Sequence, residues 1–143
     1  MMILLDTDHL SQLKFIRSDR ASILVDKLKS LPASENVAIS IISVEEQMRG
    51  WLATIAKERD VRRQVKPYKE LAALFNFFDE YLILEFNEAA VDVFEENKAR
   101  KLRIGTMDLK IASITIANKA LLLSANLSDF KQVPGLRVEN WLE

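Results

Sequence analysis

The chain has 143 residues, of which 49% are hydrophobic and 29% are charged, a composition typical of a folded globular protein and not of a disordered one. Its length favours a single domain over residues 1–143. The formal net charge of −1 gives no overall attraction to a polyanion, so nucleic-acid binding would need a local basic patch or a bound cation. Cysteine is absent, which excludes disulfides and thiolate chemistry and favours a reducing, cytoplasmic compartment.

Short apolar runs alternate with helical patterns in the first half of the chain. Residues 2–5 predict a buried strand, and Asp6 ends this run too early for a signal peptide. A first helix is expected to carry Leu10, Leu13 and Ile16. A second helix is expected over residues 21–31, where Pro32 stops it. Residues 37–41 then predict the second strand, and Ser43 is expected to open a long helix.

The second half continues the alternation. Pro67 suits the first turn of another helix, and residues 107–118 are apolar on most sides, which predicts a buried helix. The remaining expected elements are strands at 81–84, 121–123 and 136–138 and a helix through 90–94. Strands that alternate with helices predict a three-layer α/β/α sandwich around a mostly parallel sheet of about five strands. No apolar stretch approaches the roughly 20 residues that span a bilayer.

Four acidic residues are expected at one end of this sheet: Asp6, Glu46, Asp108 and Asp129. Three of them follow predicted strands, and ligand sites of parallel sheets lie beyond the carboxyl ends of the strands. Asp108 joins them only if the buried helix points its first turn at the same edge. Converging carboxylates repel one another unless a cation compensates, and oxygen ligands suit Mg²⁺ or Mn²⁺. The pattern therefore predicts metal-dependent hydrolysis of phosphodiester bonds.

Each acid except Asp6 also has a structural interpretation. Ser43 and Glu46 match a capping box, in which Glu46 only satisfies backbone donors. Asp108 follows a plausible N-cap, Thr106, and Asp129 suits a turn acceptor. Taken singly, Glu46 and Asp108 fit these structural roles better, whereas the joint pattern favours the metal site.

Scarce residue types exclude other chemistries. His9 is the only histidine, which rules out a histidine-rich zinc site and a two-histidine ribonuclease mechanism. Three glycines are too few for a phosphate-binding or dinucleotide-binding loop. His9 itself is expected to be a packed residue of the first helix.

Four segments resemble, in order, the motifs of PIN-domain ribonucleases, and among these the VapC-type toxins of bacterial toxin–antitoxin pairs. They are residues 4–11, 39–46, 104–112 and 123–130, with Pro134, Gly135 and Leu136 after the last. The resemblance implies a PIN-like fold in which Asp6, Glu46 and Asp108 are the three principal acids and Asp129 the fourth. It also implies supporting roles for Thr7, after the first acid, and for Asn126, which would orient a metal-bound water.

One departure from the family pattern is Glu45, which precedes Glu46 where relatives usually carry a small or apolar residue. The alignment favours Glu46, and Glu45 remains an alternative second acid. The resemblance further implies a cytoplasmic endoribonuclease that uses Mg²⁺ or Mn²⁺, commonly a homodimer, cutting transfer or ribosomal RNA and inhibited by a small antitoxin.

Other interpretations remain open at this stage. Asp6 and Asp8 after a strand are similar to the nucleophile and acid of aspartyl-phosphate phosphatases, although a suitable lysine is lacking. A PIN-like module that only binds a partner is the non-enzymatic alternative. Basic residues at 57–66 and 98–103 either lead phosphates towards the acids or form solvated helix faces paired with neighbouring acids.

Overall fold

The fold is known from a computed structural model that describes residues 1–14 and 19–143; Ile16, expected on the first helix, lies outside the described residues. Within that part of the chain, a parallel sheet of five strands has the order β3-β2-β1-β4-β5. Its strands are β1 (Met2–Leu5), β2 (Asn36–Ser40), β3 (Leu82–Leu84), β4 (Leu121–Leu123) and β5 (Arg137–Glu139). The three-layer α/β/α prediction is confirmed, with strand bounds shifted by at most one or two residues.

Strand β1 is central because its side chains are apolar and its neighbours cover it on both sides. Leu5 lies beside Ile39 of β2 and beside Leu123 of β4, and all three are fully buried. The chain then builds outward from β1 in both directions, so the strand order reverses between β1 and β4. In open parallel sheets this switch point forms a crevice at the carboxyl ends of the strands.

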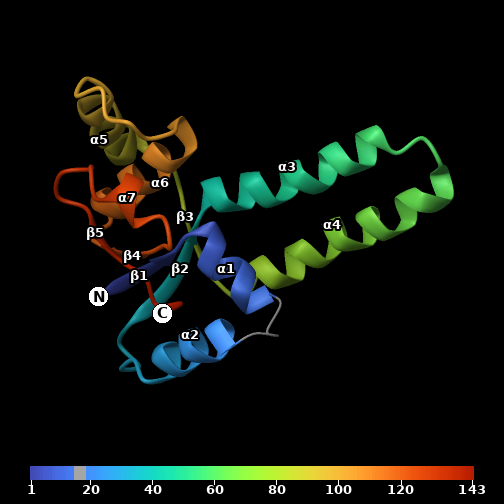
Figure 1. The fold of residues 1–143 in the computed structure, drawn as a ribbon, viewed down its shortest axis with the longest axis horizontal. Helices are drawn as coiled ribbons and strands as arrows, with labels where there is room; N and C mark the ends of the chain where they lie inside the picture. Colours follow the sequence, from blue (N-terminus) through green and yellow to red (C-terminus); the bar gives the residue numbers. More distant parts are fainter. Residues whose placement is uncertain (15–18) are drawn as a thin grey trace.

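Helices cover both faces of the sheet (Figure 1). One core holds Leu4 of β1 with Ile111 and Ile114 of the helix α6, and the other holds Leu5 with Leu24 and Leu74. The helices are α1 (Thr7–Lys14), α2 (Asp19–Lys29), α3 (Ile41–Lys57), α4 (Val65–Phe78), α5 (Glu88–Lys98), α6 (Thr106–Ala117) and α7 (Leu127–Phe130), with a 3₁₀ turn η1 at Val61–Gln64. Helix α6 is largely buried, as predicted.

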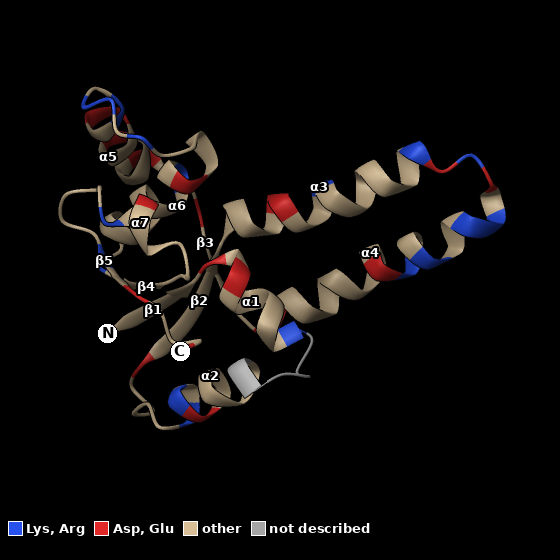
Figure 2. Ribbon diagram, viewed as in Figure 1, with Lys and Arg blue, Asp and Glu red and all other residues tan. Residues whose placement is uncertain are grey.

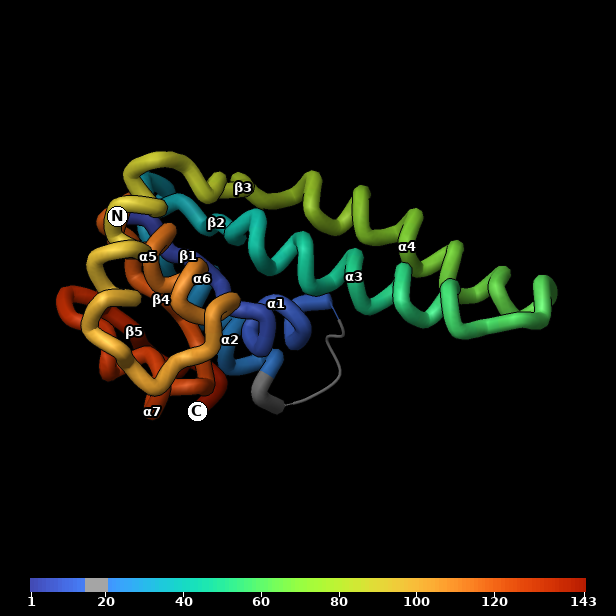
Figure 3. Tube along the Cα trace, turned by 90° about the horizontal axis from the view of Figure 1, so that it is seen from above, coloured from blue at the N-terminus to red at the C-terminus, as the bar shows by residue number. Residues whose placement is uncertain are grey.

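The helices α3 and α4 form a hairpin that projects far from the sheet, as two views show (Figures 1 and 3). Apolar side chains join the two helices near the body, among them Trp51 and Leu74. Basic residues gather at the far end of the hairpin, around η1 (Figure 2). None of the described helices is both long and apolar enough to cross a membrane.

Helix α3 begins earlier than the sequence suggested, and this overturns the capping-box interpretation of Glu46. Its N-cap is Ser40, the last residue of β2, whose side chain accepts a hydrogen bond from the Ser43 N–H at 3.1 Å. Ser43 is thus already the third helical residue, and Glu46 lies too far into the helix to cap its start. Similarly, Gly105 and not Thr106 caps α6, and the expected turn around Asp129 is the short helix α7.

Candidate active site

Asp6 ends β1 at the switch point of the sheet. Its backbone N–H donates to the carbonyl of Leu123 at 2.9 Å, which continues the β1–β4 ladder by one residue. Its carboxylate accepts from the Thr7 N–H at 2.8 Å and from the Ser124 hydroxyl at 2.7 Å. With 7% of its surface exposed, Asp6 is a buried carboxylate that the ends of two neighbouring strands hold in place.

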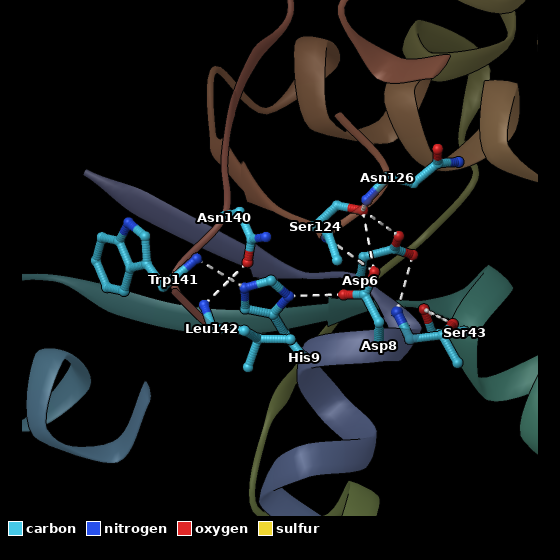
Figure 4. A network of polar contacts seen from close by, with 11 residues as sticks. Asp6, Asp8, His9, Ser43, Ser124, Asn126, Asn140, Trp141 and Leu142 are labelled. Atoms are coloured by element: carbon cyan, nitrogen blue, oxygen red, sulfur yellow. Dashed lines mark hydrogen bonds and ion pairs between the residues drawn. The ribbon is translucent and has the colours of Figure 1, made fainter. Parts of the chain in front are cut away.

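Asp8 and His9 form a second, interlocked part of the site (Figure 4). The His9 Nε2 accepts a hydrogen bond from the Trp141 N–H at 3.0 Å, so Nε2 carries no proton and Nδ1 must be the donor. Nδ1 donates to Asp8 Oδ1 at 2.6 Å, while Asp8 Oδ2 accepts from the Ala125 N–H at 2.9 Å. This network ties the first helix to the chain after β4 and to the C-terminal segment.

The two neighbouring glutamates point in different directions. The Glu46 Oε2 accepts a hydrogen bond from the Thr7 hydroxyl at 2.9 Å, which places its carboxylate next to the end of β1. Glu45 instead pairs with Arg49 one turn along α3, on the side that Ile41 and Met48 also line. The geometry therefore brings Glu46 to the site and turns Glu45 away from it.

Asp108 and Asp129 complete the acidic group. Asp108, in the first turn of α6, lies near Asn126 after β4 and close enough to Asp6 at the end of β1 for its charge to affect that carboxylate. The Asn126 amide joins the two acids, because its Nδ2 donates to Asp129 Oδ2 at 3.0 Å and lies 3.5 Å from Asp108 Oδ2. Asn126 thus positions carboxylates directly, a contact that the sequence did not predict.

Burial and the crowding of negative charge raise the pKa values of two acids of the site. Burial raises the pKa of Asp6 from 3.8 to about 7, against the Ser124 and Thr7 hydrogen bonds, and the charges of Asp8 and Asp108 add to the rise. Burial also raises the pKa of Asp108, and there the charges of Glu46, Asp129 and Asp8 contribute in that order. The pKa of Asp108 therefore responds to three other acids, and the charge of Asp108 in turn raises the pKa of Asp6.

Asp8 behaves in the opposite way. Burial alone would raise its pKa, yet the hydrogen bonds from His9 and from the Ala125 N–H outweigh that effect and hold the pKa below its usual range. Asp8 is therefore a fixed anion whose oxygens are engaged, and it differs from Asp6 in role although the two are separated by one residue.

The donor set has the chemistry that a divalent cation requires. Carboxylate oxygens are the ligands that Mg²⁺ and Mn²⁺ prefer, and an added positive charge would relieve the repulsion that raises the pKa values of Asp6 and Asp108. As they stand, no three acidic or histidine side chains of the described residues are spaced to hold one ion. Glu46, Asp108 and Asp129 are only partly buried, which leaves their side chains room to rotate towards one.

Sequence reasoning missed Ser124 and the function of the Asp8–His9 pair. Ser124 donates to Asp6 and has an oxygen of Asp8 at 3.3 Å, so it bridges two acids of the site. Its position directly after the fourth strand was an available signal, since polar residues that end buried strands face the crevice. The contact of His9 with Trp141 could not be foreseen, because 132 residues separate them.

Comparison with known proteins agrees with this architecture. The chain is 29% identical to Ribonuclease VapC2 of Rickettsia felis over 120 residues, which cover 81% of this chain and 82% of that protein. No protein-family profile matches the chain. In three dimensions it resembles a chain of VapBC2 from Rickettsia felis bound to a DNA fragment from their promoter, with 26% identity, a TM-score of 0.73 and 99% of both chains covered.

A second solved structure extends the likeness of the fold. VapBC-1 from nontypeable Haemophilus influenzae contains a chain that is 19% identical, with a TM-score of 0.75 and both chains fully covered. The strand order, the acids at the switch point and these likenesses in sequence and fold agree with one another. The chain has a PIN-like fold and is similar in sequence to a VapC ribonuclease.

Proposed function

We propose that this protein is a metal-dependent endoribonuclease and the toxin of a toxin–antitoxin pair. The observation that carries the proposal is the proximity of Asp6, Glu46, Asp108 and Asp129 at the carboxyl end of the central strands, in a chain similar to a ribonuclease over most of its length. A divalent ion, Mg²⁺ or Mn²⁺, would supply charge neutralisation at a phosphodiester and acidify a water beside it.

Hydrogen bonds from neighbouring groups orient the carboxylates of the site. Ser124 and the Thr7 N–H orient the Asp6 carboxylate, and the Thr7 hydroxyl orients that of Glu46. Asn126 holds Asp129 and reaches Asp108, so these two acids approach as a pair. Oriented in this way, the four carboxylates offer oxygen ligands from four separate elements, and a carboxylate left free of the cation can accept the proton of the attacking water.

The aspartyl-phosphate alternative finds less support in the geometry. That chemistry needs a free acid near the nucleophile, and Asp8 accepts hydrogen bonds through both oxygens. Its lowered pKa keeps it ionised, which is the wrong state for a proton donor.

The test uses purified protein and a mixture of structured RNAs. Cleavage is expected with Mg²⁺ or Mn²⁺, none with EDTA, and recovery when the ion is restored. Asp108→Asn should abolish cleavage while the thermal unfolding curve remains cooperative, and Glu45→Gln, which alters a carboxylate outside the site, should leave cleavage intact. Full activity of Asp108→Asn would refute the mechanism, and folded protein without any divalent-dependent cleavage would favour a module that only binds.

The partner and the assembly are part of the same proposal. The resemblance to VapC-type toxins implies a small antitoxin and a homodimer, and the solved relatives named above are VapBC structures. Where a short reading frame adjoins the gene, co-expression of its product with this protein is expected to give a stable complex that does not cleave RNA. Cleavage at an undiminished rate by that complex would contradict the toxin assignment and leave the nuclease assignment intact.

A further inference from the structure

The far end of the α3–α4 hairpin, here called the basic tip, carries a charge unlike that of the rest of the protein. Between residues 57 and 69 it has two acidic residues, Glu58 and Asp60, and six basic ones: Lys57, Arg59, Arg62, Arg63, Lys66 and Lys69. This segment is strongly positive, whereas the entire chain has a net charge of −1. Figure 2 shows the blue segments gathered at the end of the hairpin most distant from the sheet.

The positive charge of the basic tip is mostly not neutralised within the chain. All six basic side chains are exposed to solvent. Arg63 lies 3.9 Å from Glu58 and 3.7 Å from Asp60, and the other five form no ion pair within the described part of the chain. Exposed pairs at such distances contribute little. The interpretation of this region as a helix face paired with neighbouring acids therefore accounts for only one of its six cations.

Two adjoining hollows lie between the acidic site and the basic tip. Its inner part, of about 480 Å³, is lined by Thr7 and Glu46 at one end and by Thr54 at the other. Its outer part, of about 410 Å³, begins at Thr54 and is lined by Lys57, Glu58, Arg63 and Lys66. Each part is within the range of ligand-binding clefts, roughly 300–1,000 Å³. The two parts share Thr54, and we refer to them together as the α3 track.

One face of α3 forms the length of the α3 track. Positions 46, 50, 54 and 57 recur every three or four residues, which places them in one row on a helix. Eleven residues of helix separate Glu46 from Lys57, a distance of about 16 Å along the axis. The row therefore leads from a carboxylate of the site to the first cation of the tip.

Gly50 leaves the middle of the α3 track open. A glycine inside a helix costs about 1 kcal/mol relative to alanine. Neither packing nor backbone strain requires it here, because a Cβ at this position would have no heavy atom within 4 Å and its φ is not positive. The missing side chain instead enlarges the hollow beside Trp51, whose partly buried ring also lines it.

The opposite face of α3 has a different character. A second hollow there is lined by Ile41, Val44, Met48 and Leu52, and its surface is mainly apolar. An apolar patch of this kind suits a protein partner. The α3 track, in contrast, combines cations, hydroxyls and one aromatic ring, the mixture that binds phosphates and stacks a base.

We propose that the α3 track is the binding path for a single-stranded segment of the RNA substrate, with phosphates held at the basic tip and a base stacked near Trp51. The inference rests on the proposed ribonuclease function and deepens it, because it states how the substrate reaches the acids. A negatively charged strand would be attracted at the tip, where the charge is positive, and delivered along α3 to the carboxylates, where a cation is needed to accept it.

Binding is tested separately from cleavage. The protein carries Asp108→Asn throughout and is studied in EDTA by fluorescence anisotropy with a labelled single-stranded RNA. The triple variant Lys57→Gln, Arg62→Gln, Lys66→Gln is expected to weaken binding about tenfold or more at low salt, and to reduce the slope of log K against log salt by about 2, since each lost phosphate contact on a single strand contributes about 0.7.

The matched control removes the same charge elsewhere. Lys119→Gln, Lys131→Gln, Arg137→Gln alters three exposed cations around β4 and β5, outside the α3 track. It should change affinity and salt slope by much less than the tip variant does. Equal effects of the two triple variants would overturn the proposal, because they would show that only total charge matters.

A second pair of variants tests the path without changing charge. Gly50→Leu fills the middle of the α3 track and also favours the helix, so loss of folding is not expected. Ala56→Leu adds the same side chain at an exposed position of α3 that lines neither part of the track. Gly50→Leu should weaken RNA binding by roughly tenfold, the size of one lost stacking contact, and Ala56→Leu should not. Unchanged RNA binding in Gly50→Leu would overturn the proposal.

The outcomes separate this inference from the proposed function. Cleavage by the unmodified protein combined with equal behaviour of tip and control variants would reject the α3 track and retain the nuclease. Track-dependent RNA binding by a protein that never cleaves would retain the track and reject the nuclease. Loss of antitoxin binding, with RNA binding intact, in the tip variant would assign this surface to the protein partner and overturn the proposal.

Discussion

The acidic site has two halves that the fold treats differently. In the half built around the buried Asp6, here called the buried half, Asp6 and the partly buried Asp8 accept hydrogen bonds from Thr7, Ser124, Ala125 and His9 and belong to the connection between β1 and α1. In the exposed half, Glu46, Asp108 and Asp129 are only partly buried, come from three different helices, and are supported by two side chains, Thr7 and Asn126.

The difference suggests that one half of the site is held in place by the fold, whereas the other half can adjust to a ligand. A carboxylate fixed by several donors cannot move without breaking them, so the buried half provides a fixed reference point. The exposed half is free to adjust, which agrees with the finding that no three of the described acids are spaced for one ion as they stand. Substitutions in the exposed half are therefore expected to affect activity with little change in stability, and those in the buried half to change stability as well.

The largest expected effect separates the two glutamates of α3. Glu46→Gln should reduce RNA cleavage at least about 100-fold, because it removes a charge that faces Asp108, whereas the unfolding midpoint should change little. Glu45→Gln is the matched control on the adjacent residue and should retain activity within about twofold. Initial rates at saturating Mg²⁺ measure both. A greater loss in Glu45→Gln would reverse the assignment that the geometry makes.

The sequence predicted the strands and the convergence of the acids because both depend on local patterns. Asp6 directly follows a continuous apolar run, and parallel strands bring their carboxyl ends together. The assignment of Glu46 was harder, since Ser43 and Glu46 match a capping box; Ser40 is the actual cap because β2 passes directly into α3. A motif predicts a cap only if the helix boundary is known.

The supporting contacts could not be predicted, because they join residues that are distant in the sequence. Ser124 meets Asp6 across 118 positions, and the register of β1 with β4 creates this contact. The projecting hairpin also escaped prediction: its helices were expected, but not that their far ends extend beyond the sheet. Both the Ser124–Asp6 contact and the projection of the hairpin depend on how distant elements pack, which a single sequence does not show.

An intermediate effect is expected at Asp6 and concerns stability. Its pKa is about 7 in the folded protein and 3.8 as the reference, so the folded state binds more protons between these values and loses stability as pH rises through them. The amide of an asparagine at this position cannot ionise. In EDTA at pH 8, the free energy of unfolding measured in urea should therefore be about 2–4 kcal/mol larger for Asp6→Asn than for the unmodified protein. This difference should shrink towards pH 4.

Two comparisons keep that prediction specific. The exposed Asp92 of α5 serves as control, and Asp92→Asn should show no such pH-dependent gain. Added Mg²⁺ should reduce the advantage of Asp6→Asn, since a cation that binds the folded site stabilises only the protein that retains the carboxylate. An Asp6→Asn protein that is less stable at pH 8 would show that the ionised carboxylate supports the fold.

The smallest expected effect, at Asp8, has the opposite sign. Asp8→Asn leaves one acceptor oxygen for two strong donors, the His9 Nδ1–H and the Ala125 N–H, so one donor loses its partner at a cost of about 1–3 kcal/mol in urea unfolding at pH 7. Because the folded pKa of Asp8 lies below its usual value of 3.8, its ionised form contributes stability above that value and loses the contribution as pH falls through the folded pKa. The cost of Asp8→Asn should therefore fade in acid, where the benefit of Asp6→Asn also fades, although the two effects differ in sign. The contradicting result is a change of the same sign in the free energy of unfolding of both variants at pH 8. It would show that Asp6 and Asp8 affect stability in the same way, and not as an ionised acid that is disfavoured and one that is stabilised by hydrogen bonds.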